Sequence, residues 1–173
     1  MKKNTYSTRK IAFLGLMLGI IIVLLHVERM LPPFPFFPPN FKLGLSNIIV
    51  MFAIFFVGVK DAFTLGILKA FFNMLMRGYV GGILSLTGGM LSITIISLFS
   101  FIFKKRISLV ALSILGALSH NIGQLVMASF LLNSPYLFMA FLPYLMIAGV
   151  ILGTFTGISA NTIMPIFKRI YVK

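Results

Sequence analysis

The 173 residues of this chain are 60% hydrophobic, include fifteen basic side chains against two acidic ones, and contain no cysteine. With a mean hydropathy of +1.09, the sequence has too few polar residues to cover a soluble globule, so we predict an all-α integral membrane protein. Without cysteine there is no disulfide and no thiolate chemistry. Two acids and no phosphate-binding loop exclude a carboxylate metal cage, paired-carboxylate catalysis and ATP hydrolysis by this chain alone. We therefore expect no metal, no cofactor, no catalytic residue and no enzyme activity of its own.

Six apolar runs divide the chain into predicted membrane spans. A helix needs about 20 apolar residues to cross the hydrocarbon of a bilayer. The first run lacks a small-residue cleavage site and comparable runs come after it, so we interpret it as a permanent span and not as a signal peptide. The prediction is a single domain of six transmembrane helices, at residues 11–31, 43–59, 62–79, 82–103, 107–132 and 136–167.

The basic residues orient these spans. Eleven of the fifteen lie before the first run, between the second and third, between the fourth and fifth, or after the sixth. By the positive-inside rule this side is cytoplasmic, and both termini are on it. Because orientation accounts for most of the +13 net charge, we predict no nucleic-acid binding.

The four other basic residues fall in the outer half of the predicted membrane domain. Arg29, Lys42 and Arg77 lie at outer ends of spans, whereas Lys69 lies near mid-membrane. A charge near a helix centre costs roughly 2.5 to 3.5 kcal/mol on insertion scales, so Lys69 should face protein, water or ligand. Lys69, Asn73 and Arg77 are spaced i, i+4, i+8, which puts them on one helical face.

Polar residues of other spans share this outer half, and the inner half has few. A pore would carry polar residues along its whole length, so this distribution favours a pocket open to the outside, and its net positive charge favours a ligand with phosphate or carboxylate. The alternative is that some of these side chains only join helices or reach the headgroups. The predicted substrate-binding residues are Asn47, Lys69, Asn73, Arg77, His120, Asn121 and Gln124, with Arg29 and Lys42 at the mouth.

Three smaller features carry further expectations. Residues 32–42 are rich in Pro and Phe, which excludes a regular helix, and we predict either a lid over the pocket or an interfacial anchor. Ala12, Gly15 and Gly19 form a small-residue face on the first span, which serves either packing within the monomer or docking of a partner. Asp61 is predicted to be a helix N-cap.

Two motifs and the first helix resemble a known family. The run Lys42-Leu43-Gly44-Leu45-Ser46-Asn47, the run Ser119-His120-Asn121-Ile122-Gly123-Gln124 and the small-residue first helix resemble the Gx transporter family, also described as heptaprenyl diphosphate synthase component I. That family is similar to the S components of energy-coupling factor (ECF) transporters, which are six-helix vitamin-binding proteins of the bacterial cell membrane. The resemblance covers nearly the whole chain.

The resemblance implies an ECF S-component-like bundle that captures a vitamin-like small molecule at its outer face. Its partners would be a transmembrane coupling protein, contacted by the small residues of the first helix, and two cytoplasmic ATPases. Residues 32–42 correspond to the first outer loop, which gates the site in S components. Prenyl diphosphate synthases bind magnesium diphosphate through aspartate-rich motifs, whereas this chain has one Asp. We therefore do not expect this chain to catalyse prenyl diphosphate synthesis by itself. The alternatives are a non-transporting accessory protein of prenyl or quinone synthesis or of extracellular electron transfer, and a small channel.

Overall fold

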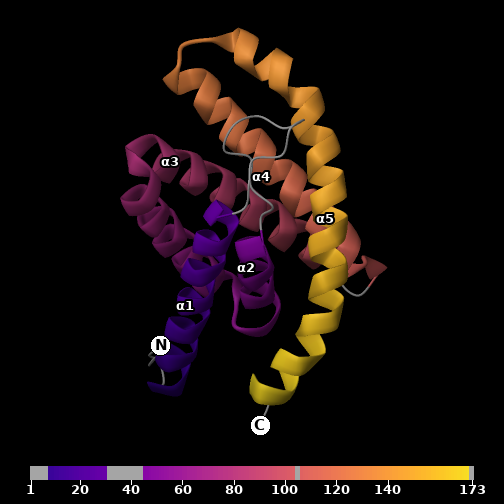
Figure 1. Cartoon of the computed structure of the whole chain (residues 1–173). Helices are drawn as coiled ribbons and strands as arrows, with labels where there is room; N and C mark the ends of the chain where they lie inside the picture. Colours follow the sequence, from indigo (N-terminus) through magenta and orange to yellow (C-terminus); the bar gives the residue numbers. More distant parts are fainter. Residues whose placement is uncertain (1–7, 31–44, 104–105, 172–173) are drawn as a thin grey trace, which may run out of the picture.

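A computed structural model describes residues 8–30, 45–103 and 106–171 of the protein, and helices account for nearly all of them (Figure 1). No strand occurs in these ranges. The five helices are α1 (Thr8–Met30), α2 (Leu45–Phe56), α3 (Val59–Phe103), α4 (Leu109–Leu131) and α5 (Pro135–Tyr171).

Four of these helices, α1, α3, α4 and α5, are long and apolar enough to cross a membrane. These helices support the predicted class of all-α multi-pass membrane protein. With 12 residues, α2 is about 18 Å long, well short of the roughly 30 Å hydrocarbon thickness. Six separate spans and the cytoplasmic position of the termini stay predictions.

The third and fourth predicted spans are the two arms of one element, α3. This 45-residue helix is interrupted at Gly78, which has φ 78° and ψ 178°, a conformation that glycine adopts at little cost because it has no Cβ. We call residues 59–77 the first arm and residues 79–103 the second arm. The sequence predicted the break at residues 80–81, close to its position in the structure.

Glycines let the two arms lie against each other. A Cβ added to Gly82 of the second arm would lie 2.5 Å from Cβ of Met74 in the first arm. Farther from the bend, a Cβ on Gly66 would lie 2.8 Å from Cδ1 of Ile93. The arms therefore form a tightly packed antiparallel pair.

The short helix α2 lies at the centre of the core and contacts α1, α3 and α5 (Figure 1). An apolar helix without a polar face is stable only where neighbours cover it all round. Eight of its residues are buried, namely Ser46 and the seven from Ile48 to Ile54. The core around them includes Met17 and Ile21 of α1 and Leu65 of the first arm.

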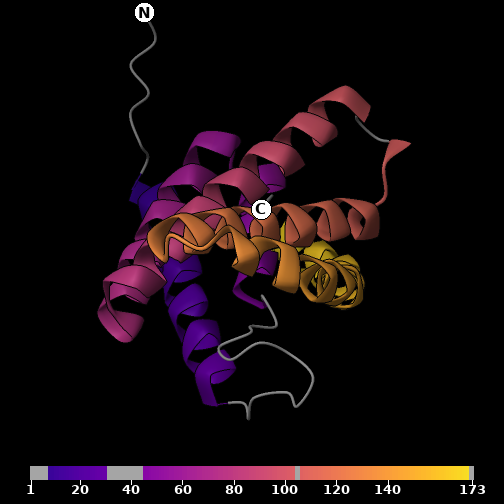
Figure 2. The same cartoon turned by 90° about the horizontal axis from the view of Figure 1, so that it is seen from above.

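Helix α4 lies between α3 and α5, as the view from above shows (Figure 2). Three glycines of α5, spaced four residues apart, bring its backbone onto α4; a Cβ on Gly153 would lie 2.6 Å from Cα of Ile114. Small residues at this spacing permit close helix packing in lipid. The pairs run in antiparallel register, Gly149 with Leu118, Gly153 with Ile114 and Gly157 with Val110.

Both acidic residues of the chain connect α1 to a neighbouring helix. Nζ of Lys10 lies 2.8 Å from Oδ2 of Asp61, which belongs to the first turn of α3. The predicted role of Asp61 as an N-cap is therefore wrong, because the residue lies inside the helix and its carboxylate faces α1. At the other end of α1, Oε1 of Glu28 accepts a hydrogen bond of 3.2 Å from the backbone N–H of Ser46. That position, at the N-terminus of α2, favours a negative charge.

Candidate functional site

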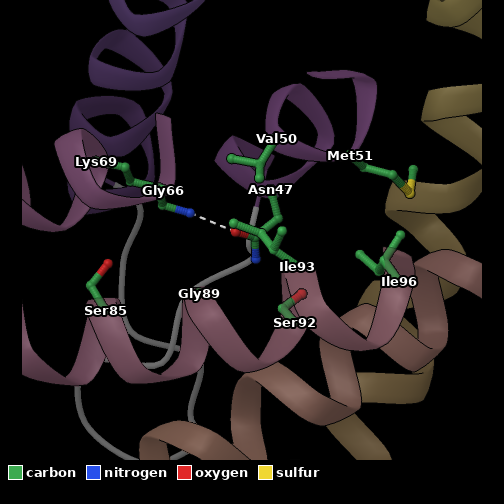
Figure 3. Close-up of a pocket in the computed structure, with 10 residues that line it drawn as sticks. All are labelled: Asn47, Val50, Met51, Gly66, Lys69, Ser85, Gly89, Ser92, Ile93 and Ile96. Atoms are coloured by element: carbon green, nitrogen blue, oxygen red, sulfur yellow. Dashed lines mark hydrogen bonds between the residues drawn. The ribbon is translucent and has the colours of Figure 1, made fainter. Parts of the chain in front are cut away.

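A small cavity lies between α2 and the two arms of α3 (Figure 3). Its volume is about 10 Å³, room for roughly one water molecule. The wall combines polar groups with apolar side chains and contains no acidic residue. The lining residues are Asn47, Val50, Met51, Gly66, Lys69, Ser85, Gly89, Ser92, Ile93 and Ile96.

Two of the predicted binding residues, Lys69 and Asn47, meet at this cavity. Lys69 lies on the first arm, and its side chain is 6% exposed. Its Nζ donates a hydrogen bond of 2.5 Å to Oδ1 of Asn47 on α2 (Figure 3). Lys69 thus faces protein and the cavity, which is the environment that a charge within an apolar helix requires.

Two cavity-lining serines of the second arm, Ser85 and Ser92, were not predicted from the sequence. Within the described residues, neither hydroxyl makes a hydrogen bond. Other hydroxyls of this arm behave differently, since Thr87 and Thr94 donate to carbonyls of their own helix, the usual choice for Ser and Thr within a helix. Both serine side chains point from their helix toward α2 and the first arm (Figure 3).

Gly89 lies between the two serines on the same helical face. Residues 85, 89, 92 and 96 are spaced by four, three and four, which aligns them along the helix. A Cβ added at Gly89 would have no atom within 4 Å, so the missing side chain leaves part of the cavity open. This spacing of small and polar residues is visible in the sequence, and it is the pattern from which these cavity-lining residues could have been predicted.

Asn73 and Arg77 lie closer to the bend than Lys69. The Nδ2 group of Asn73 donates to the carbonyl of Gly81 at 2.9 Å, so this buried amide ties the two arms together. Arg77 is half-buried. Neither residue lines the cavity.

The charged residues near the bend of α3 lie around Glu28 of α1. Its carboxylate interacts electrostatically with Lys69 and with Arg77. Arg29 is exposed, and its Nη1 donates to the carbonyl of Met76 at 3.2 Å. Lys69, Arg77 and Arg29 are thus accompanied by one carboxylate, and the local charge is net positive. Lys42, the other predicted mouth residue, and the predicted lid at residues 32–42 lie outside the described residues.

The three predicted residues of α4 face neighbouring helices. His120 and Gln124 lie against the second arm, because a Cβ on Gly88 would come within 3.0 Å of Cε1 of His120 and 2.7 Å of Cγ of Gln124. Asn121 turns to α5, where its Nδ2 donates to the carbonyl of Leu145 at 2.9 Å. None of the three lines the cavity. The hydrogen bond of Asn121 joins two helices, which is the alternative to ligand binding that the sequence had left open.

The small-residue face of α1 is open. Ala12, Gly15 and Gly19 are exposed, and a Cβ added to either glycine would have no described atom within 4 Å. These glycines therefore differ from those of α5, which touch the backbone of the next helix. Packing against the described part of the chain does not account for them.

Fold and site together define a multi-pass helical membrane protein in which one buried lysine meets polar groups at a small internal cavity. The chain belongs to the family described as heptaprenyl diphosphate synthase component I, with a match that runs over residues 17–163. That range includes the cavity, both arms of α3 and all of α4. No curated protein and no solved structure matches the chain significantly.

Proposed function

We propose that the chain is the membrane-embedded substrate-binding subunit of an ECF-type transporter in a bacterial cell membrane. It captures an anionic or amphipathic, vitamin-like small molecule at Lys69. The observation that carries the proposal is the burial of this ammonium group at a polar cavity between α2 and the two arms of α3. Burying a charge is costly unless it is paired, and the neutral amide of Asn47 is its only hydrogen-bond partner among the described residues.

The charges around the cavity favour an anion. Arg29 and Arg77 add positive charge toward the bend, and Glu28 offsets one unit of it. A cavity with room for about one water must widen to admit a vitamin-sized molecule. We propose that α2 and the arms of α3 separate during capture and that residues 32–42 act as the lid. Asn47 and Lys69 form the inner part of the site, and Arg77, Arg29 and Lys42 its mouth.

The open face of α1 supports a partner in the membrane. We propose that Ala12, Gly15 and Gly19 dock to a transmembrane coupling protein, which links the chain to two cytoplasmic ATPases. The chain itself has no phosphate-binding loop, so the energy for transport comes from these partners. Ion pairing at Asp61 and capping by Glu28 fix the two ends of α1, which keeps the open face in place for docking.

The family description favours a second candidate function. A component I implies a further component, and this chain would then be the non-transporting membrane part of a prenyl diphosphate synthase whose catalytic aspartates lie in the partner. A prenyl diphosphate has an anionic head and an apolar tail, so the site chemistry fits this function too. The two candidates differ in the partners that they require.

Affinity purification separates these functions. Gly15→Leu fills the open face of α1, where a side chain meets no described atom, so the variant should fold. For the transporter subunit, a coupling protein and two ATPases co-purify with the tagged wild-type chain and are lost with Gly15→Leu. A matched control, Thr162→Leu on an exposed position of α5, keeps them. Co-purification of a soluble prenyl synthase subunit instead, identified by mass spectrometry, would overturn the transporter proposal.

A further inference from the structure

The cavity presents hydrogen-bond donors from three directions. Lys69 contributes Nζ from the first arm, and Ser85 and Ser92 contribute hydroxyl groups from the second arm. Asn47 on α2 currently accepts from Lys69. If its amide group rotates by half a turn, it presents its Nδ2 donor to the same space. No acidic side chain lines the cavity, so the four groups together suit an oxyanion.

An oxyanion competes well with Asn47 for Lys69. The ammonium group of Lys69 makes a charge-assisted hydrogen bond with either acceptor, but an oxyanion adds the attraction of a full negative charge, which is strong in a site of low dielectric. The serine hydroxyls form no hydrogen bond with the described residues, so they contribute to an anion without first breaking another contact. An incoming oxyanion therefore replaces one neutral acceptor and gains several donors.

The rest of the wall restricts the group to which the oxyanion is joined. Val50, Met51, Ile93 and Ile96 make this part of the cavity apolar, and Gly89 leaves space where any other residue would place a side chain. A phosphate or carboxylate joined to a narrow apolar group matches the chemistry of this wall, and the cavity, which holds about one water molecule, widens to admit it. A ligand with a charged or branched group beside its head does not.

We propose that the Lys69 cavity is the head-group subsite for a single compact oxyanion, a phosphate monoester or carboxylate, held by Ser85 and Ser92 and admitted by the absence of a side chain at Gly89. The inference rests on the proposed role of Lys69 as the anchor of an anionic ligand. It adds three specificity-determining residues on the second arm and the class of head group.

Octyl phosphate is a suitable probe, measured by calorimetry with the full chain in nanodiscs of zwitterionic phosphatidylcholine. Octanol and octylamine test whether the head group must be an anion. Octanoate tests whether a planar carboxylate can replace the phosphate, and inorganic phosphate tests whether the head group binds without the apolar chain. We expect octyl phosphate or octanoate to bind at least tenfold more tightly than octanol. Octylamine should not bind at the site.

The variants test the second arm. Ser85→Ala combined with Ser92→Ala should weaken binding of the anionic probe about tenfold or more, and Gly89→Val should abolish it by filling the cavity. Gly89→Ala should give an intermediate loss of binding, and it provides a test of this position if the larger Gly89→Val variant does not fold. Thr94→Ala removes a hydroxyl of the same arm that bonds to Met90 of its own helix and should bind like the wild type.

The outcomes are distinct. The head-group inference is overturned if the wild type binds neither anion more tightly than octanol, or if the serine and Gly89 variants bind like the wild type. If the serine and Gly89 variants bind like the wild type while Lys69→Met weakens binding, Lys69 anchors a ligand that does not enter this cavity. The head-group inference then fails, and the proposed function is retained. If the probe and variants behave as expected but no ATPases co-purify, the subsite stands and the transporter proposal fails.

Discussion

At the scale of single residues, the carboxylate of Asp61 is held by an ion pair without which its burial would be costly. Asp61 pairs with Lys10, and Glu28 interacts with Lys69 and Arg77. The side chain of Asp61 is 5% exposed, whereas that of Lys10 is 31% exposed. The two partners of this ion pair are thus unequal, because only the lysine reaches solvent.

This inequality predicts an asymmetric loss of stability. Lys10→Met leaves a buried carboxylate without its partner and should cost about 3 to 5 kcal/mol. Asp61→Asn leaves a lysine that can turn outward, so its cost should be smaller, about 1 to 2 kcal/mol. Unfolding of both variants and of the double variant in detergent measures the difference. Equal losses, or a larger loss for Asp61→Asn, would contradict this account of the pair.

At the scale of helices, the sequence predicted element type and approximate boundaries, because long apolar runs in a membrane protein have few alternatives to a helix. The bend of α3 lies at Gly78, inside the predicted third span and two residues before the predicted break at residues 80–81. The predicted second span became the 12-residue α2. Its apolar run continues to residue 59, whereas the helix ends at Phe56, before Gly58 with its positive φ, and hydropathy does not show where a helix within such a run ends.

The small residues of α1 were predicted to serve either packing within the chain or docking of a partner, whereas Gly149, Gly153 and Gly157 of α5 have the same spacing and were overlooked. Their roles differ in the structure, where the α5 glycines touch α4 and the α1 glycines touch no described residue. Spacing identifies a close-packing face. Whether the partner lies in the same chain depends on the arrangement of the other helices, which spacing does not contain.

This difference predicts opposite responses to the same substitution. Gly153→Leu places a side chain against Cα of Ile114 at 2.6 Å and should separate α4 from α5, at a cost of about 3 kcal/mol or more in the free energy of unfolding. Gly19→Leu meets no described atom and should leave stability within about 0.5 kcal/mol. Thermal unfolding with size-exclusion chromatography compares them. A stable Gly153→Leu protein would show that this contact does not hold the helices together.

At the scale of the whole molecule, the sequence predicted the depth of the polar residues in the membrane, which stays a prediction, and could not assign their neighbours. Lys69 and Asn47 were both predicted to line the binding site, and the structure brings them into hydrogen-bond contact. His120 and Asn121 are adjacent in sequence, yet about 100° of helical rotation turns one toward the second arm and the other toward α5. Ser85 and Ser92 were missed because isolated serines in an apolar run usually bond to their own helix.

Native mass spectrometry measures whether Lys69 anchors an anionic ligand within the membrane domain. Wild-type, Lys69→Met and Thr94→Ala proteins are purified in parallel, and the occupancy by co-purifying small molecules is compared. We expect an anionic ligand on the wild type and on Thr94→Ala. For Lys69→Met we expect at least a tenfold loss of affinity, because removal of a charge-assisted hydrogen bond costs roughly 1.5 to 3 kcal/mol. A folded Lys69→Met protein that retains the same ligand at the same occupancy would contradict the anchoring role of this lysine.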